Sequence, residues 1–343
     1  AGATMIVPQE ELAVIGFSGV IAKLPVILRA RRAILDDVAR FQPDAALLVD
    51  YPGFNLRLGP ELKRLGVKVF YYIAPQVWAW HAERAAQMAA WVDRLAVVFP
   101  FEERIFRDAG VAAHFVGHPL LDDLAPELDE ATFRAELGVP AEARLVGLLP
   151  GSRAGEMRAH ARTLLDVGQR LRARFPDVVP VLALARNLTT DGLPAHLLEG
   201  VTVVKGRTHS VQAHAACCAV ASGTATLETA LLGSPLAIVY RVGWLNHAIA
   251  RRVVKLSHIG LPNIVAGREV APEFIQGDFR ADTVAATLGG WLADPMALAE
   301  RREALREVRE AVAGVATVQL FSATKNRGVD EARRFLDGCL KLV

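Results

Sequence analysis

Short apolar runs that alternate with helical patterns are the feature that most narrows the folds open to this chain. Most of the intervening segments carry apolar residues at helical spacing. The runs lie at residues 45–49, 67–73, 95–98, 114–116, 145–149, 178–184, 201–204, 219–221 and 236–240. Strands that are apolar throughout are typical of parallel sheets covered by helices. The sequence therefore predicts an α/β chain with doubly wound, Rossmann-like sheets.

The length of 343 residues suggests two or three domains. Residues 120–143 are rich in Asp, Glu, Ala and Pro, and we place the interdomain connection there. The five apolar runs after this stretch predict a complete doubly wound domain in the second half of the chain.

The composition excludes several classes of protein. The 39 basic and 37 acidic residues nearly balance, so the sequence gives no electrostatic case for a nucleic-acid partner. The 3 cysteines form neither a disulfide framework nor a zinc pattern. No apolar run is long enough to span a bilayer. The numbering opens on Ala1 inside what reads as an ordinary segment, and we expect an upstream piece.

The run at 145–149 leads into a Pro-Gly-Ser-Arg turn and then a helical pattern. At such a turn Gly151 and Ser152 bring backbone N–H groups close to a ligand, and Arg153 can bond phosphate oxygens. Glu156 follows in the first helical turn. We interpret this stretch as a cradle for a diphosphate. The alternative is an ordinary strand-to-helix loop with a surface Arg.

A second turn of small residues, Ser222, Gly223 and Thr224, follows the run at 219–221. The first amides of its helix suit a phosphate, and Glu228, about one turn further on, suits the two hydroxyls of a ribose. The alternative is a helix cap with a carboxylate on the helix face.

In the first half, polar residues and two tryptophans follow strand ends, where ligands of parallel sheets gather. They are Asp50, Asn55, Gln76, Trp78, Trp80 and His118. The alternatives are that Asp50 caps a turn, that the tryptophans fill a core, and that His118, between Gly117 and Pro119, only holds its turn.

Apolar residues between 17 and 38 fall on one helical face, and Pro25 should kink or divide that helix. Its first apolar residues face either a core or an anionic membrane: Phe17, Val20, Ile21 and Leu24. Further helices are expected at 244–256, 280–292, 295–312 and 329–340, and a loop at 261–269.

Together these motifs resemble lipid-A-disaccharide synthase, a family of inverting glycosyltransferases with the two-domain GT-B fold. The stretches that carry the resemblance are 10–16, 50–55, 75–80, 115–119, 148–156, 221–228 and 261–269. Each motif alone is weak, whereas their order and spacing together are specific.

The resemblance implies transfer of 2,3-diacylglucosamine from its UDP donor to 2,3-diacylglucosamine 1-phosphate (lipid X), which forms the β-1,6-linked disaccharide of lipid A. It also implies work at the cytoplasmic face of the inner membrane, a homodimer that exchanges C-terminal segments, and no metal or other cofactor. With both substrates acylated, the face that begins at Phe17 becomes a membrane-docking surface.

The resemblance implies that the chain consists of three parts with separate roles. Residues 1–143 would form the acceptor domain, which faces the membrane and lacks the family's first strand and Gly-Glu-x-Ser-Gly-Asp loop. Residues 144–315 would bind the UDP-sugar in the cleft, and residues 316–343 would pack on an N-terminal domain or be exchanged in a dimer.

The resemblance also implies roles for single residues. Arg153 would neutralise the leaving diphosphate, the turn at Ser222 would hold phosphate, and Glu228 would hold ribose. The nucleotide pocket would be completed by Asn263, Glu273 and Gln276. The general base would be Asp50, Asp44 or His118, because many relatives carry an Asp where this chain has Gly53.

Two rival functions stay open at this stage. A UDP-N-acetylglucosamine 2-epimerase would share the architecture and the ribose-binding Glu but would need no lipid acceptor. An inactive UDP-binding remnant is suggested by Gly53 and by the absent first loop.

Overall fold

The computed structural model describes residues 5–8, 16–78, 83–242 and 257–313, with the side chains of residues 16–23 left aside. These residues fall into two compact units. The first runs up to Val98 and includes Glu102–Gly117, and the second comprises Phe99–Phe101 and the chain from His118 onward. Residues 118–143, which the sequence analysis grouped with the first domain, thus lie in the second unit.

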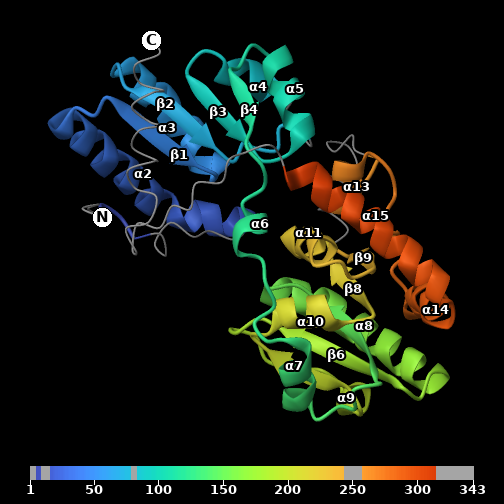
Figure 1. Cartoon of the computed structure of the whole chain (residues 1–343). Helices are drawn as coiled ribbons and strands as arrows, with labels where there is room; N and C mark the ends of the chain where they lie inside the picture. The colour runs from blue at the N-terminus through green and yellow to red at the C-terminus, as the bar shows by residue number, and fades with distance from the viewer. Residues whose placement is uncertain (1–4, 9–15, 79–82, 243–256, 314–343) are drawn as a thin grey trace. The chain divides into compact units, whose positions relative to one another are not determined.

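The first unit is a parallel sheet of four strands in the order β1-β2-β3-β4, with helices between the strands (Figure 1). Its elements are α2 (Gly16–Phe41), β1 (Ala45–Val49), α3 (Pro52–Arg64), β2 (Lys68–Tyr72), α4 (Glu83–Met88), β3 (Arg94–Val97), α5 (Pro100–Asp108) and β4 (Ala113–Phe115). Pro25 does not divide α2. A proline removes one helical hydrogen bond, and packing of Ile27, Ile34 and Leu35 on the core holds the helix beyond it.

The second unit is a parallel sheet of six strands in the order β10-β9-β8-β5-β6-β7 (Figure 1). The elements up to β8 are α6 (Leu120–Asp123), α7 (Glu130–Leu137), β5 (Arg144–Leu149), α8 (Ala154–Arg174), β6 (Val178–Leu184), α9 (Ala195–Leu198), β7 (Thr202–Lys205), α10 (Thr208–His214) and β8 (Cys217–Ala221). The remainder are α11 (Thr224–Leu231), β9 (Leu236–Tyr240), α13 (Leu261–Ala266), β10 (Glu273–Ile275), α14 (Ala281–Ala293) and α15 (Pro295–Ala313).

Both units are parallel α/β sheets, so the predicted fold class is confirmed. One local prediction was wrong and one element was missed. The segment predicted as a loop at 261–269 begins with helix α13, in which Pro262 occupies the first turn, where its missing N–H costs nothing. The edge strand β10 was not predicted at all. The helices expected at 244–256 and 329–340 lie outside the described residues.

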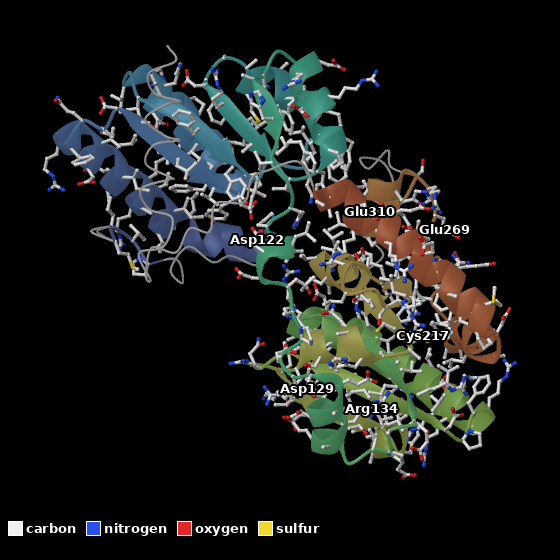
Figure 2. The ribbon with its side chains drawn as sticks, in the orientation of Figure 1. Asp122, Asp129, Arg134, Cys217, Glu269 and Glu310 are labelled. Atoms are coloured by element: carbon white, nitrogen blue, oxygen red, sulfur yellow. The ribbon has the colours of Figure 1, made fainter. Side chains whose placement is uncertain are left out.

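The core of the second unit is built around β5 and β8. Every residue of β8 is buried, and Cys217 (labelled in Figure 2) belongs to the same buried cluster as apolar residues of α8 and α14. Cys218 points to the other face, because successive side chains of a strand alternate. There Gly147 leaves room for its sulfur, since a Cβ on Gly147 would lie 2.7 Å from Cys218 Sγ and 3.1 Å from Val211 Cγ1.

Polar contacts fix the ends of α7 in the second unit. Asp129 caps the helix, and its Oδ1 accepts a hydrogen bond from Thr132 N at 3.0 Å. Arg134, on the same helix (Figure 2), donates to the carbonyl of Ala143 at 2.7 Å. The Arg134 contact attaches α7 to the residue directly before β5. Among the described helices, none is both long and apolar enough to cross a membrane.

Candidate functional site

A cavity of about 390 Å³ opens in the second unit at the carboxyl ends of β5 and β8. These two strands are neighbours, although the chain visits β6 and β7 between them. The order of strands therefore reverses at this point, and open α/β sheets bind ligands in the crevice that forms there. Eight residues predicted for the site line it: Gly151, Ser152, Arg153, Glu156, Ser222, Gly223, Thr224 and Glu228.

The turn after β5 forms a ring of hydrogen-bond donors. The backbone N–H groups of Ser152 and Arg153 both donate to Glu156 Oε2, at 3.0 and 3.2 Å. The guanidinium of Arg153 donates to Glu156 Oε1 at 2.8 Å. Two amides and a guanidinium are the donors that a phosphate needs. In this structure they hold the carboxylate of Glu156.

Gly151 makes this arrangement possible. Its φ is 108°, in the region that favours glycine. A Cβ at this position would lie 2.4 Å from Glu156 Oε2 and 2.7 Å from Glu156 Cβ. Any larger residue would therefore displace the carboxylate or the turn.

The opposite wall comes from the turn after β8 and from α11. Gly223 has φ 152°, and its carbonyl accepts bonds from the amide of Thr226 at 3.1 Å and from its hydroxyl at 2.7 Å. These bonds fix the first turn of α11 beside the cavity. The side chain of Glu228, further along the same helix, is 19% exposed and lines the cavity. The two predicted motifs thus lie at one site.

His209 and Thr208 also line the cavity, and the sequence analysis missed both. His209 Nε2 lies 3.8 Å from Glu228 Oε2. The sequence contained a signal for these two residues. Gly206 follows the apolar run at 201–204, just as Gly151 and Gly223 follow the runs that precede the two predicted turns.

The start of α10 is held by Glu127. Its carboxylate accepts bonds from the amides of His209 and Ser210 and from the Ser210 hydroxyl, at 3.2, 2.7 and 2.8 Å. Burial works to raise the pKa of Glu127, but these hydrogen bonds outweigh it and lower that pKa below its ordinary value. Glu127 thus stays ionised and keeps His209 beside the cavity.

Asn263, Glu273 and Gln276 do not line this cavity. Asn263 is fully buried, and all its polar contacts are internal: Nδ2 donates to Ala271 O and Glu273 Oε1, and Oδ1 accepts from Val270 N and Ala271 N. Glu273 accepts from the amides of Ile259 and Gly260. Gln276 bonds both backbone groups of Val242. In the structure, these three side chains therefore hold segments of the backbone in place.

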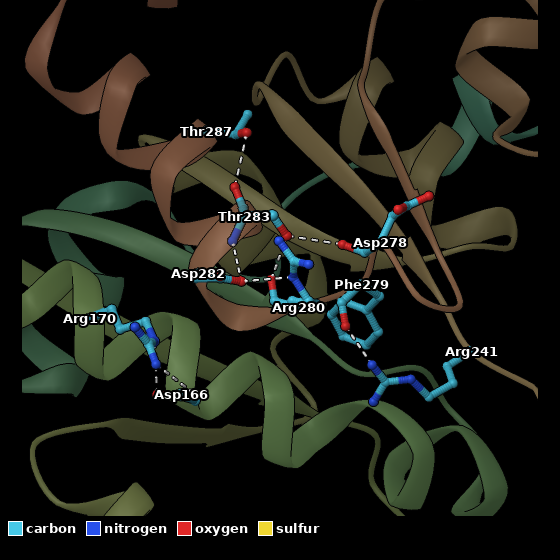
Figure 3. Close-up of polar contacts among 9 residues, drawn as sticks. All are labelled: Asp166, Arg170, Arg241, Asp278, Phe279, Arg280, Asp282, Thr283 and Thr287. Carbon is cyan, nitrogen blue, oxygen red and sulfur yellow. Dashed lines mark hydrogen bonds and ion pairs between the residues drawn. The ribbon is translucent and has the colours of Figure 1, made fainter.

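A further cavity of the second unit, of about 440 Å³, contains no predicted site residue. One of its walls is Arg241, which donates to the carbonyl of Phe279 (Figure 3) and lies over the Phe279 ring at 4.8 Å from its centroid. Arg241 also donates to Thr163 Oγ1 at 3.2 Å. These contacts attach the segment after β10 to helix α8.

In the first unit, β1 ends in a strained turn. Asp50 and Tyr51 both have φ 45°, which is unusual for residues with side chains. Asn55 Nδ2 and the Tyr71 hydroxyl hold the turn by donating to the carbonyl of Asp50, at 2.7 and 2.8 Å. Burial, and next the charge of Asp50, raise the pKa of Tyr71. The side chain of Asp50 stays exposed at the carboxyl edge of the sheet, and Asn55 serves the backbone.

Two of the three predicted candidates for a general base, Asp44 and Asp50, lie at opposite ends of one strand. Asp44 precedes β1 and Asp50 follows it, so a strand of 5 residues separates them. Such a strand is roughly 17 Å long, and Asp44 lies at the edge opposite to the predicted site.

His118 is fixed in its turn. Its Nδ1 accepts a bond from Leu120 N at 3.2 Å, its amide donates to Val312 O, and its ring packs on Phe99. Burial lowers the pKa of His118 to about 4. Because Nδ1 accepts, the proton of the neutral ring is on Nε2, which makes this nitrogen a donor rather than a base.

The remaining predicted residues lie in the first unit. Trp78 Nε1 donates to Glu102 Oε1 at 2.9 Å, and Gln76 is exposed. In α2, Leu24 is 40% exposed. Phe17, Val20 and Ile21 lie on the same helix, but their side chains are outside the described set, as is Trp80.

Three solved structures show the same fold at low sequence identity. A Staphylococcus aureus MnaA–UDP co-structure aligns with a TM-score of 0.58 and 8% identity, over 92% of this chain and 80% of that one. A UDP-GlcNAc 2-epimerase from Neisseria meningitidis, bound to UDP-GlcNAc, aligns with a TM-score of 0.54 and 11% identity, over 88% and 83%. A sucrose-phosphate synthase from Thermosynechococcus elongatus aligns with a TM-score of 0.52 and 16% identity, over 95% and 80%.

Sequence comparison is more specific. A protein named lipid-A-disaccharide synthase from Geobacter sulfurreducens is 42% identical over 314 residues, which are 90% of this chain and 82% of that protein. One of the same name from Anaeromyxobacter sp. strain K is 42% identical over 313 residues, with the same coverage. The model of the family described as lipid-A-disaccharide synthetase matches residues 1–315. The chain therefore belongs to the lipid-A-disaccharide synthetase family.

Proposed function

We propose that this chain is a glycosyltransferase that moves 2,3-diacylglucosamine from UDP to 2,3-diacylglucosamine 1-phosphate and so forms the lipid A disaccharide. The observation that carries the proposal is the cavity between β5 and β8, where both predicted motifs line one crevice at the reversal of strand order. Family membership and UDP in the MnaA co-structure support a UDP donor at this crevice.

The donor's diphosphate would take the place of the Glu156 carboxylate. Arg153 and the amides of Ser152 and Arg153 form the donor ring, and the side chain of Arg153, which is 60% exposed, is accessible to a ligand. As the bond from sugar to UDP breaks, negative charge grows on the leaving phosphate, and fixed donors lower the barrier by stabilising it. Glu228 then holds the ribose, with His209 beside it.

Transfer with inversion needs one proton acceptor. The acceptor's 6-hydroxyl oxygen attacks the anomeric carbon, the carbon–oxygen bond to UDP breaks, and the hydroxyl proton passes to a carboxylate. Of the three candidates we assign Asp50, which is exposed at a carboxyl strand edge. Asp44 lies at the opposite edge, and His118 presents a donor.

The proposal also covers where the protein acts in the cell and how it assembles. We propose that the protein acts as a peripheral enzyme on the cytoplasmic face of the inner membrane. The exposed side chains of Leu24 and Leu28 on α2, at 40% and 49%, support docking by this helix. A homodimer and a metal-free reaction complete the proposal.

Calorimetry with UDP tests the site. Arg153→Ala and Glu228→Ala should each weaken UDP binding about tenfold or more, since charge-assisted bonds contribute about 1.5–3 kcal/mol. The matched control is Arg158→Ala, an exposed arginine one turn further along α8. Parent-like affinity in both folded variants would refute the nucleotide site.

A transfer assay separates the proposal from its rivals. Incubation of the UDP-diacylglucosamine donor with and without the acceptor should give the disaccharide and UDP only when the acceptor is present. Epimerisation of UDP-N-acetylglucosamine without an acceptor would favour the epimerase. UDP binding with no turnover would favour the inactive remnant.

A further inference from the structure

A separate cavity of about 400 Å³ lies in the first unit between helices α3 and α4. Its apolar wall includes Leu56, Met88 and Trp91, and its polar lining is Arg57, Arg84 and Gln87. This size is within the range of ligand pockets, about 300–1,000 Å³. None of the predicted site residues lines it.

The apolar wall is rigidly built. Met88 is fully buried and Trp91 is 6% exposed. The indole of Trp91 lies directly against α3, because a Cβ on Gly59 would be 2.1 Å from Trp91 Cζ3. Glycine inside a helix costs about 1 kcal/mol relative to Ala. At this position it lets the indole pack under the helix and form part of the cavity wall.

The charge of the cavity is uncompensated. No carboxylate lines it, and in the described part of the chain neither Arg57 nor Arg84 has an ion pair or a side-chain hydrogen bond. Two guanidiniums that share one cavity without an anion repel each other. A phosphate bound between them would remove this repulsion and accept charge-assisted hydrogen bonds.

The cavity also begins next to the proposed base. Its lining starts at Pro52 and Gly53, the first residues of α3, directly after the strained turn of Asp50 and Tyr51. One end of the cavity therefore lies close to the carboxyl edge of β1.

We propose that this cavity binds the acceptor, an acylated sugar phosphate, with its phosphate between Arg57 and Arg84 and an acyl chain against Leu56, Met88 and Trp91. The inference rests on the proposed function and adds the site of the second substrate. Charge complementarity selects the phosphate, and the apolar wall selects the chain.

Steady-state kinetics test the phosphate contacts. Arg57→Gln and Arg84→Gln should each raise the KM for the acceptor about tenfold, the loss of one charge-assisted contact, and leave the KM for the UDP donor unchanged. Arg104→Gln is the matched control, because Arg104 lies on α5 of the same unit and its side chain is 89% exposed. Unchanged acceptor KM in both variants, in an active enzyme, would overturn the proposal and leave the proposed function intact.

Tryptophan fluorescence tests the acyl wall without turnover. An acceptor with a bromine on its acyl chain should quench the parent, and Trp91→Phe should remove most of that quenching. Glucosamine 1-phosphate and the brominated, unphosphorylated sugar should bind at least tenfold more weakly. Equal quenching by the phosphorylated and unphosphorylated forms, or by brominated anionic phospholipid vesicles, would overturn the proposal. Quenching without transfer would instead count against the proposed function alone.

Discussion

Replacing Glu156 by Gln should tighten UDP binding, although Glu156 lies in the proposed nucleotide site. In the structure its carboxylate holds the two amides and the guanidinium that the diphosphate requires. A nucleotide must therefore displace it, and the displaced charge then stays near the incoming anion. Gln keeps the length of the side chain and removes the charge.

The size of the effect follows from the contacts that must break. A carboxylate that caps a helix contributes about 1 kcal/mol. The ion pair with Arg153 adds about 0.5 kcal/mol, a value reduced by solvent because the Arg153 side chain is 60% exposed. Gln keeps an oxygen that can accept an amide bond, so only about half of the cap contribution is lost, and the sum of about 1 kcal/mol corresponds to a roughly fivefold lower Kd for UDP. The same change should lower the free energy of unfolding by about 0.5–1 kcal/mol, because the neutral amide caps α8 more weakly.

Titration calorimetry with UDP, paired with urea denaturation, measures both effects. Asp166→Asn is the control, because it breaks an exposed pair on the same helix, with Arg170, and should change neither quantity much. Weaker UDP binding by Glu156→Gln would refute the reasoning, since it would mean that Glu156 positions Arg153 for the nucleotide and does not compete with it.

Three further predictions concern the first unit and the His118 turn. Burial lowers the pKa of His118 from 6.5 to about 4. Between pH 6.5 and pH 4 the unfolded chain therefore binds more protons than the folded chain, and the free energy of unfolding falls as the pH falls through this range. Urea denaturation at two pH values should show a loss of about 1–2 kcal/mol between pH 7 and pH 5 that His118→Asn removes; an identical slope in the variant would contradict this. Gly59→Ala should destabilise by about 2 kcal/mol or more, because its Cβ would meet the Trp91 ring at 2.1 Å, and a rise in denaturation midpoint would refute that packing. Gly53→Ala in the same helix has open space around it and should raise the unfolding free energy in urea denaturation by about 0.5–1 kcal/mol; a lower value than in the parent would contradict this.

The central strands β5, β6, β8 and β9 were predictable because burial on both faces leaves almost only apolar residues in them. Both ends of β6 and β9 fall where the sequence analysis placed them. The edge strand β10 has only three residues, all partly exposed, so it lacks this signal. Helix α13 was missed because Pro262 and Asn263 resemble a loop locally, although a proline at a helix start is common.

The cavity was predictable for a similar reason, since it depends on turns that follow strands in the sequence. Asp44 was a poor candidate even without a structure, because it precedes the strand that Asp50 follows. The contacts of Asn263 could not be foreseen. Its partners are backbone groups of Val270 and Ala271, and their approach depends on how the segment folds back after α13.

The two adjacent thiols at the start of β8 can report separately on the loss of each layer that covers the second sheet. Cys217 faces α8 and α14, whereas Cys218 faces the side of Gly147 and Val211. Burial raises the pKa of Cys217 to about 12 and raises that of Cys218 as well, so neither sulfur reacts until a layer lifts away. Rates of thiol alkylation at the two neighbours, resolved by peptide mass, therefore distinguish loss of one helical cover from loss of the other.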